Sequence, residues 1–250
     1  MFISPSVFWQ SLLISSLVLI IPIAFSSIED SYLAHNCLSS SRGEFTPGSA
    51  YQQSLLYLVD NLCANAPKKA GFWNASWAEV PSERAYGLAL CRGDVSPEDC
   101  KTCLTKATIT VAKTYCPHSR GAIIWRDYCM LKYSDLDFLG KMNSITGYIA
   151  IMGNVSDSNF REAALGLMGN LSQTAIGAPH KFFANGTTAL ENRATLYSMV
   201  QCTRDISADY CRGCLAIARA EISIRSMNND SGQVVSASCN VRYDRLPFLN

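Results

Sequence analysis

The motif CRGDVSPEDCKTCL at residues 91–104 recurs as CTRDISADYCRGCL at residues 202–215. Both copies have the spacing Cys-x8-Cys-x2-Cys-Leu, and the second begins 111 positions after the first. Self-similarity at a fixed offset is the sequence signature of repeated structural units. The chain is therefore predicted to be a tandem repeat. Two further residue types coincide at this offset: Asp94 with Asp205, and Ser96 with Ser207.

The sequence around each motif repeats the same order of elements. Apolar residues at helical spacing precede it, an amphipathic stretch follows it, and then comes a strand-like segment that contains a cysteine. For each half we predict the order strand, helix, helix, strand, with several strands. This is an α+β fold, in which two helices cover one face of an antiparallel sheet. The segments are 51–62, 104–114 and 121–133 in the first half, and 160–171, 215–226 and 232–243 in the second.

The two halves are separated by a polar, glycine-containing stretch, DLDFLGKMNSI, near residues 135–145. We place the first domain at 27–136, the linker at 137–145 and the second domain at 146–250. Domains of this size bury only about two-thirds of their unfolded surface, so covalent cross-links contribute much of their stability.

The N-terminus has the pattern of a secretory signal peptide. Residues 1–26 carry no charged side chain, and the stretch from Leu12 to Phe25 is nearly all apolar. The usual Lys or Arg near the start is missing, and an uncleaved signal anchor is the alternative. Pro22, close to the small residues around Ser26, favours cleavage after Ser26. No second apolar stretch of spanning length follows, so we expect the mature protein to be soluble and extracellular.

Five sequons of the form Asn-x-Ser/Thr agree with export and predict some N-glycosylation. We expect the third to be blocked, because it lies on a segment predicted to be a packed helix. The sequons are at Asn74, Asn154, Asn170, Asn185 and Asn229.

Composition and motifs exclude several classes of protein. Of the 250 residues, 48% are hydrophobic and 16% are charged, and the net charge is +1. No basic run provides the electrostatic footprint that nucleic-acid binders need. No nucleophile elbow, zinc-protease motif or Gly-rich phosphate loop is present. His35, His118 and His180 lie in polar or turn-like contexts, so we predict that they are solvated and that the protein is not an enzyme. A glycosidase pair of carboxylates stays open, because no two acidic residues stand out.

Eleven cysteines are the strongest compositional signal. A zinc site would need two Cys-x2-Cys pairs close together, and a thioredoxin-like motif would need a βαβ context. Cys100–Cys103 and Cys211–Cys214 meet neither condition, so structural disulfides are the expectation in an exported chain. The second half keeps four cysteines, enough for two bridges, whereas the first has seven. Three positions differ between the halves, and which two of the three pair is left open by the residues: Cys37 aligns with Tyr148, Cys116 with Met227, and Cys63 falls near Ser172.

The two Cys-x8-Cys-x2-Cys copies, the secretory leader and the ending CNVRYDRLPF (239–248) resemble the plant cysteine-rich repeat secretory proteins. Their domains are homologous to ginkbilobin, an antifungal seed lectin, and the resemblance covers roughly residues 28–250. It implies a set of five disulfides and leaves Cys63 unpaired. The implied pairs are Cys91–Cys100, Cys103–Cys129, Cys37–Cys116, Cys202–Cys211 and Cys214–Cys239.

The implied bridges make the domains unequal. The short loops should contribute about 2–3 kcal/mol each and the long Cys37–Cys116 loop about 4–5 kcal/mol, so the second domain should be the less stable. Cys63 has two interpretations: a buried thiol on the inner face of the first helix, or an intermolecular disulfide.

The resemblance also suggests a carbohydrate site. Ginkbilobin binds mannose through an Asn beside its first cysteine, an Arg six residues before its last cysteine and a Glu five residues after it. Those positions read Leu38, Ile123 and Ser134 in the first domain, so the triad is absent there. In the second domain they read Gln233 and Asp244, which can hydrogen-bond a sugar without the five donors of an Arg. The alternative is that the two residues are simply polar side chains on the surface of a strand and bind no ligand.

A third class is protein recognition, because tandem domains of this family form the ectodomains of plant receptor-like kinases and plasmodesmal proteins. Trp73, Trp77 and Trp125 are candidates for a binding face, although Trp125, in a strand, fits the core better. Arg92-Gly93-Asp94 has the order of an integrin motif, but its place inside a disulfide loop favours a polar turn.

We therefore predict a secreted, non-enzymatic recognition protein of the plant extracellular space (the apoplast), acting in defence or cell-surface signalling. Its expected partner is an extracellular protein or a cell-wall carbohydrate, with no cofactor, metal or nucleic acid. The alternative is a mannose-type lectin with antifungal activity.

Overall fold

The computed structural model describes residues 30–250 apart from 39, 144, 154–157, 191–193 and 226–228. The predicted signal peptide, its cleavage site after Ser26 and the Asn154 sequon lie outside the described residues.

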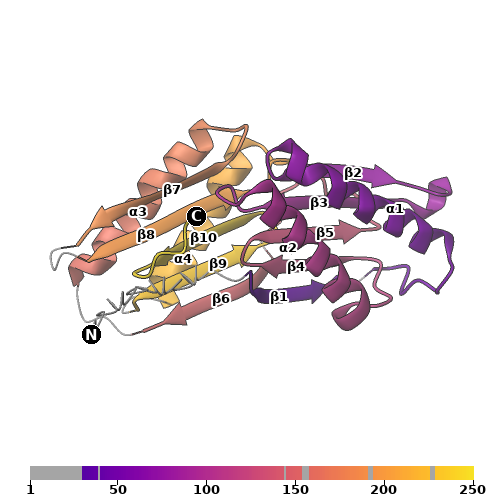
Figure 1. Ribbon diagram of the computed structural model, residues 1–250, viewed down its shortest axis with the longest axis horizontal. Helices are drawn as coiled ribbons and strands as arrows, with labels where there is room; N and C mark the ends of the chain where they lie inside the picture. The colour runs from indigo at the N-terminus through magenta and orange to yellow at the C-terminus, as the bar shows by residue number, and fades with distance from the viewer. Residues whose placement is uncertain (1–29, 39, 144, 154–157, 191–193, 226–228) are drawn as a thin grey trace, which may run out of the picture.

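The two halves fold into two five-stranded antiparallel sheets with the same strand order. The first sheet has the order β1-β4-β5-β3-β2 and the second β6-β9-β10-β8-β7. Figure 1 shows the sheets lying end to end along the long axis of the molecule. The first half consists of β1 (Tyr32–Cys37), α1 (Ala50–Asn65), β2 (Phe72–Trp77), β3 (Ala85–Cys91), α2 (Pro97–Thr110), β4 (Ala122–Arg126) and β5 (Cys129–Ser134). The second consists of β6 (Thr146–Met152), α3 (Ser158–Gly177), β7 (Phe183–Ala189), β8 (Thr195–Cys202), α4 (Ala208–Arg225), β9 (Ser231–Ser236) and β10 (Cys239–Asp244).

The predicted fold class is confirmed, and the predicted order of elements needs two corrections. Each strand-like segment with an internal cysteine is a hairpin, because the chain turns at Asp127–Tyr128 and at Ala237–Ser238. Neither pair is a usual hairpin signal such as Asn-Gly. Two further strands lie between the helices of each half, β2 and β3 in the first and β7 and β8 in the second.

The helices that carry the cysteine motif begin earlier than the amphipathic pattern indicated. Ser96 caps α2, since its hydroxyl accepts a hydrogen bond from the Asp99 amide at 3.1 Å. Ser207 caps α4 in the same way, with the Tyr210 amide at 3.2 Å. Serine at this position satisfies a backbone donor that the helix leaves unpaired. The two serines shared by the repeat are therefore helix starts.

The cysteines of α2 and α4 join each helix to two neighbouring strands. Cys100 and Cys103 lie three residues apart on one face of α2. They bond to Cys91 of β3 and Cys129 of β5, which are register partners. The second sheet repeats this with Cys202–Cys211 and Cys214–Cys239, and the first adds Cys37–Cys116 at a sequence separation of 79. The five pairs are those that the resemblance implies.

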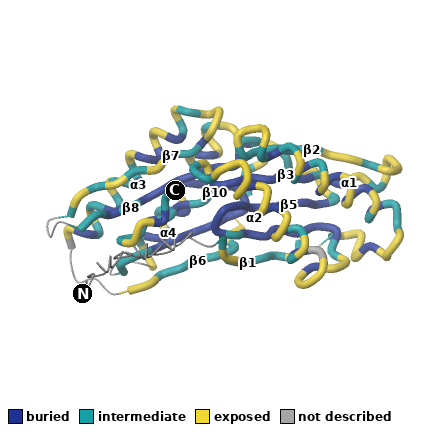
Figure 2. Tube along the Cα trace, viewed as in Figure 1, coloured by how far each residue is buried: buried dark blue, intermediate teal, exposed yellow. Residues whose placement is uncertain are grey.

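Each sheet has its core on the face that the helices cover. Leu58 and Leu62 of α1 are almost fully buried against the first sheet. Gly87 of β3 allows this approach, because a Cβ there would lie 2.8 Å from the Leu62 Cδ1 atom. Figure 2 shows β3, β5 and β8 buried along most of their length, whereas the edge strand β2 is largely intermediate or exposed.

The helix-free faces of the two sheets meet in a third apolar cluster. Trp125 of β4 is 2% exposed and packs with Val235 and Ala237 of the second half. Its indole nitrogen donates to the Ser236 carbonyl at 3.0 Å. Gly147 permits this contact, because a Cβ there would lie 2.2 Å from the Trp125 ring. The tandem domains therefore share a buried interface.

Candidate functional site

The polar centre of the domain interface is a buried carboxylate between two arginines. Asp127, in the β4–β5 turn, is 6% exposed. Its Oδ2 atom lies 3.3 Å from Nη1 of Arg92, and its Oδ1 atom lies 3.1 Å from Nη1 of Arg242. Arg92 belongs to the first half and Arg242 to β10 of the second, so this one carboxylate bridges the domains.

The C-terminal segment completes this cluster. The Phe248 carbonyl accepts a hydrogen bond from Arg92 at 2.9 Å. The centre of the Phe248 ring lies 4.0 Å from the Arg242 guanidinium carbon. The Asp94 carboxylate pairs with Arg92 at 2.7 Å and accepts from the Asn250 amide at 3.0 Å. A guanidinium is stabilised by such aromatic faces and carboxylates together.

These contacts settle the geometry of Arg92-Gly93-Asp94. The Arg92 side chain is 2% exposed, and its guanidinium is held by Asp94 and Asp127. Gly93 lies against Phe183 of β7, where a Cβ would approach the ring to 2.3 Å. The tripeptide is a domain contact in this structure, consistent with the expected turn and unlike an exposed integrin-type loop.

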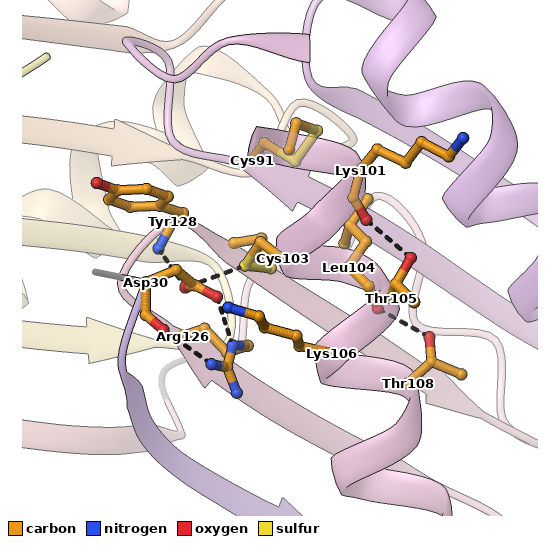
Figure 3. The surroundings of a disulfide bond; sticks show 12 residues. Asp30, Cys91, Lys101, Cys103, Leu104, Thr105, Lys106, Thr108, Arg126 and Tyr128 are labelled. Carbon is orange, nitrogen blue, oxygen red and sulfur yellow. Dashed lines mark hydrogen bonds and ion pairs between the residues drawn. A yellow bond between two sulfur atoms is a disulfide. The ribbon is translucent and has the colours of Figure 1, made fainter. Parts of the chain in front are cut away.

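The β4–β5 turn that presents Asp127 is anchored by the start of the first domain. Figure 3 shows the Asp30 carboxylate directed at Arg126, beside the Cys103 sulfur. The Arg126 Nε atom lies 2.8 Å from this carboxylate, and the Tyr128 amide donates to it at 3.3 Å. The Asp127 amide donates to the Ser31 carbonyl at 2.8 Å. Residues 30–31 therefore fix the turn on which the interface depends.

Beside this cluster a cleft of about 210 Å³ opens between the domains; we call it the junction cleft. The short helix η1 (Ala66–Lys69), the loop that follows it, and the Cys91–Cys100 loop form its first wall. Lys181, Gln201 and Arg204 form its second wall. Gln201 is tied to the first domain, because its amide nitrogen donates to the Cys91 carbonyl at 3.0 Å. Each domain therefore supplies one side of the cleft.

The Arg204 guanidinium connects the two domains beside the junction cleft. It donates to the His180 carbonyl at 2.7 Å, to the Lys69 carbonyl at 2.6 Å and to the Phe72 carbonyl at 3.3 Å. Its carbon lies 4.9 Å from the centre of the Phe72 ring. Burial lowers the pKa of Arg204, although an arginine stays charged at any physiological pH. Its partners in the described part of the chain are carbonyls and a ring.

Gln233 and Asp244, the expected sugar ligands, share the helix-free face of the second sheet. Gln233 is 5% exposed, and its amide nitrogen donates to the Asn240 side chain at 3.3 Å. The Asp244 carboxylate pairs with Arg242 at 3.1 Å and accepts from the Leu246 amide. Arg242 therefore lies beside both residues. The sequence analysis missed it, because an arginine was sought only at the position that Gln233 occupies. Phe248 packs on this arginine, so a sugar bound here would have to displace the C-terminal segment.

In the first domain the corresponding positions are apolar or buried. Ile123 is fully buried and Ser134 is 7% exposed, while Leu38 is half-buried. Leu38 borders a hollow of about 380 Å³ above the Cys37–Cys116 bridge, which His118 also lines.

The other candidate aromatic and histidine residues are spread over the surface and core. Trp73 packs in the first core and donates to Asn61 at 2.9 Å, while Trp77 is 38% exposed and stacks on Tyr57. Trp125 is buried between the domains, the place that its strand favoured. His118 and His180 are exposed, and His35 stacks on Tyr115 at 4.0 Å.

The sequons lie on different elements. Asn74 and Asn185 occupy the same repeat position on the edge strands β2 and β7. Asn170 lies on α3 as expected, but its side chain is exposed, so burial does not block it. The Asn229 amide nitrogen donates to the Gly153 carbonyl.

Cys63 is the free thiol of the described chain. It is half-buried on α1, and its sulfur lies 3.5 Å from the Thr108 hydroxyl of α2. Burial raises the pKa of this thiol. The cysteines of both Cys-x2-Cys pairs are bonded to strand cysteines, which removes them as zinc ligands or as an internal redox pair.

Sequence reasoning did not find the interface arginines or the junction cleft. Arg92, Arg204 and Arg242 lie far apart in the chain, and no spacing rule relates them. The sequence offered one clue to the interface, Arg92. It directly follows Cys91, where the chain leaves β3.

Comparison with known proteins finds matches across both halves of the chain. The family described as "Salt stress response/antifungal" matches residues 36–136 and 150–245. An "Antimicrobial ginkbilobin-2-like protein" of Castanea crenata is 39% identical over 87% of this chain and 89% of its own. "Cysteine-rich repeat secretory protein 38" of Arabidopsis thaliana is 36% identical over 89% of this chain and 88% of its own.

A solved structure has the same fold. The tandem DUF26 ectodomain of the Arabidopsis thaliana cysteine-rich receptor-like protein PDLP8 superposes with a TM-score of 0.75 at 22% identity, over 86% of this chain and 98% of that chain. No helix in the described part of our chain has the length and hydropathy to cross a bilayer. With its repeated motif, its five disulfides and matches across both halves, this chain belongs to the salt stress response/antifungal family of tandem cysteine-rich domains.

Proposed function

We propose that the protein is a secreted, non-enzymatic recognition protein of the plant extracellular space, which binds an extracellular protein or carbohydrate in defence or cell-surface signalling. The secretory pattern of residues 1–26 and the name of the Arabidopsis relative support export. The receptor-like relatives use the matched region as part of longer chains, since this chain covers 32% of one of them at 34% identity.

The observation that carries this proposal is the shared domain interface. The Asp127 carboxylate, the buried Trp125 and the C-terminal segment join two small domains into one body. The junction cleft has walls from both domains, which two independently moving domains would not maintain. A composite, partly polar concave surface supported by buried contacts is typical of binding proteins.

The test is an array that holds plant cell-wall polysaccharides, neutral glycans and extracellular receptor ectodomains. The secreted protein is probed after enzymatic deglycosylation, so that its own glycans take no part. Saturable binding to one class supports recognition by this protein. A blank on every class, with the protein shown to be folded, would overturn the proposal.

A mannose-type lectin with antifungal activity is the second candidate, favoured by the antimicrobial relative from Castanea crenata. In this chain its ligands would be Gln233 and Asp244, with Arg242 beside them. Inhibition of hyphal growth that mannose relieves, and that Asp244→Ala abolishes, would support it. Equal inhibition by the variant and the unchanged protein would contradict it.

A further inference from the structure

The junction cleft contains positive charge that no described residue neutralises. Lys181 is exposed, and neither Lys181 nor Arg204 forms an ion pair with a described residue. None of the described residues that line the cleft is acidic. Arg92 also lines it, but Asp94 and Asp127 balance its charge.

Two acidic side chains of the Cys91–Cys100 loop are engaged elsewhere. The Asp94 carboxylate binds Arg92, and Asp99, in the first turn of α2, accepts from the Ser96 hydroxyl at 2.7 Å. Neither one borders the cleft. Arg204 donates to three carbonyls through Nη1 and Nη2, which leaves its Nε–H and one Nη1 N–H for a ligand. Because the cleft holds two cations and no acidic residue among the described residues that line it, the ligand that fits it carries negative charge.

Several apolar side chains lie on the wall that faces these cations. Val95 and Pro97 of the Cys91–Cys100 loop and Pro67 of η1 line it, with Leu90 at the end of β3. A sugar ring has one face of C–H groups that packs on such a surface, while its substituents reach polar groups at its edge. The junction cleft, with a volume of about 210 Å³, is smaller than the roughly 300–1,000 Å³ of pockets that enclose drug-sized molecules. The space suits one ring of a longer chain.

We propose that the junction cleft binds a uronic acid residue of an acidic polysaccharide. Its carboxylate lies between Arg204 and Lys181, and its ring packs on the proline and valine wall of the first domain. This assignment rests on the proposed recognition function and names its ligand class. It also requires both domains, because the cations come from one and the apolar wall from the other.

The test is calorimetric titration of the intact secreted protein with a short oligomer of galacturonic acid. A neutral galactose oligomer of the same length and inorganic phosphate serve as comparison ligands. We expect the acidic oligomer to bind at least about tenfold more tightly than either comparison ligand. Its affinity should fall as the salt concentration rises. Equal affinity for the neutral oligomer or for phosphate would overturn the assignment of a uronate.

Lys181→Glu tests the site without disturbing the fold, because this side chain is exposed and forms no side-chain hydrogen bond or ion pair with a described residue. We expect it to weaken binding by about tenfold. Lys113→Glu is the matched control, an exposed lysine on the short helix Val111–Tyr115 that does not line the cleft. Equal losses in both variants would reduce the effect to net charge and overturn the site.

Arg204→Lys tests the guanidinium. It keeps the positive charge but loses the planar group and its N–H donors, so we expect weaker binding with an unchanged salt dependence. Unchanged affinity in this variant would contradict the role given to Arg204. If the acidic oligomer does not bind at all, the cleft assignment fails. The recognition function is judged separately, by the array.

Discussion

At the scale of single residues, Lys132 places a buried charge between the domains. It is 2% exposed on the helix-free face of β5, with its Nζ atom 3.9 Å from the centre of the Phe138 ring. Burial lowers its pKa from 10.5 to about 8, although the Asp205 carboxylate of the second domain opposes the shift. Between these two pH values the unfolded chain binds the extra proton, so the free energy of unfolding rises with pH there.

We therefore expect Lys132→Met to raise the free energy of unfolding by up to about 3 kcal/mol at pH 7. The gain should shrink by about 2 kcal/mol at pH 9.5, where the native lysine is already neutral. Urea denaturation at the two pH values measures it, with Lys106→Met on the exposed side of α2 as control. A gain that is the same at both pH values would show that packing, and not charge, is responsible.

Cys63 should be a slow thiol in the native protein. Its half-buried position between α1 and α2 raises its pKa, which reduces the thiolate fraction that reacts. We expect alkylation to be slow under native conditions and to label one cysteine per chain after denaturation without reduction. Intact-mass spectrometry counts the labels, and Cys63→Ser is the control that should show none. Three or more labels would contradict the disulfide arrangement, and a dimer that reduction dissolves would favour an intermolecular bridge.

At the scale of elements, the serine of each motif should decide how firmly its helix begins. Ser96→Ala removes the hydroxyl that accepts from the Asp99 amide, and we expect it to lower the free energy of unfolding by about 1 kcal/mol. Ser207→Ala should have a similar effect at α4. Chemical denaturation measures both, and Ser82→Ala, an exposed serine in the short helix Pro81–Glu83 that caps no helix, is the control. An unchanged free energy of unfolding in both variants would contradict this prediction. It would show that the adjacent disulfides already hold the helix starts in place.

The disulfides also predict that the two sheets differ in stability. The first sheet has the Cys37–Cys116 bridge, whose long loop is worth about 4–5 kcal/mol, and the second has no counterpart. We expect amides of β6 and β9 to exchange with deuterium faster than those of β1 and β4. Mass spectrometry of the glycan-free protein compares them. Equal protection would mean that the domain interface makes the whole chain unfold as one unit.

At the scale of the whole molecule, Asp127 should hold the domains together. Asp127→Ala leaves Arg92 and Arg242 without their shared carboxylate, and breaking a buried ion pair costs about 3–5 kcal/mol. We expect a lower melting temperature and a larger radius of gyration by solution X-ray scattering. Asp209→Ala removes an exposed pair with Arg212 on α4 and should change neither quantity measurably. A variant that melts earlier without expanding would show that the contacts stabilise the fold but do not set the domain arrangement.

The sequence alone determined the repeat, the fold class and the even set of cysteines in the second half, because these are written in local periodicity and in a fixed spacing. Hairpins were merged into single strands, since Asp127–Tyr128 and Ala237–Ser238 lack the usual turn residues. Only the tertiary structure decided the domain interface and the junction cleft. Arg92, Arg204 and Arg242 each contact the opposite domain, and contacts between residues more than a hundred positions apart leave no mark in local sequence. For the same reason Gln233 and Asp244 were identified as candidates by position, while the Arg242 and Phe248 contacts that govern access to them come from the folded chain.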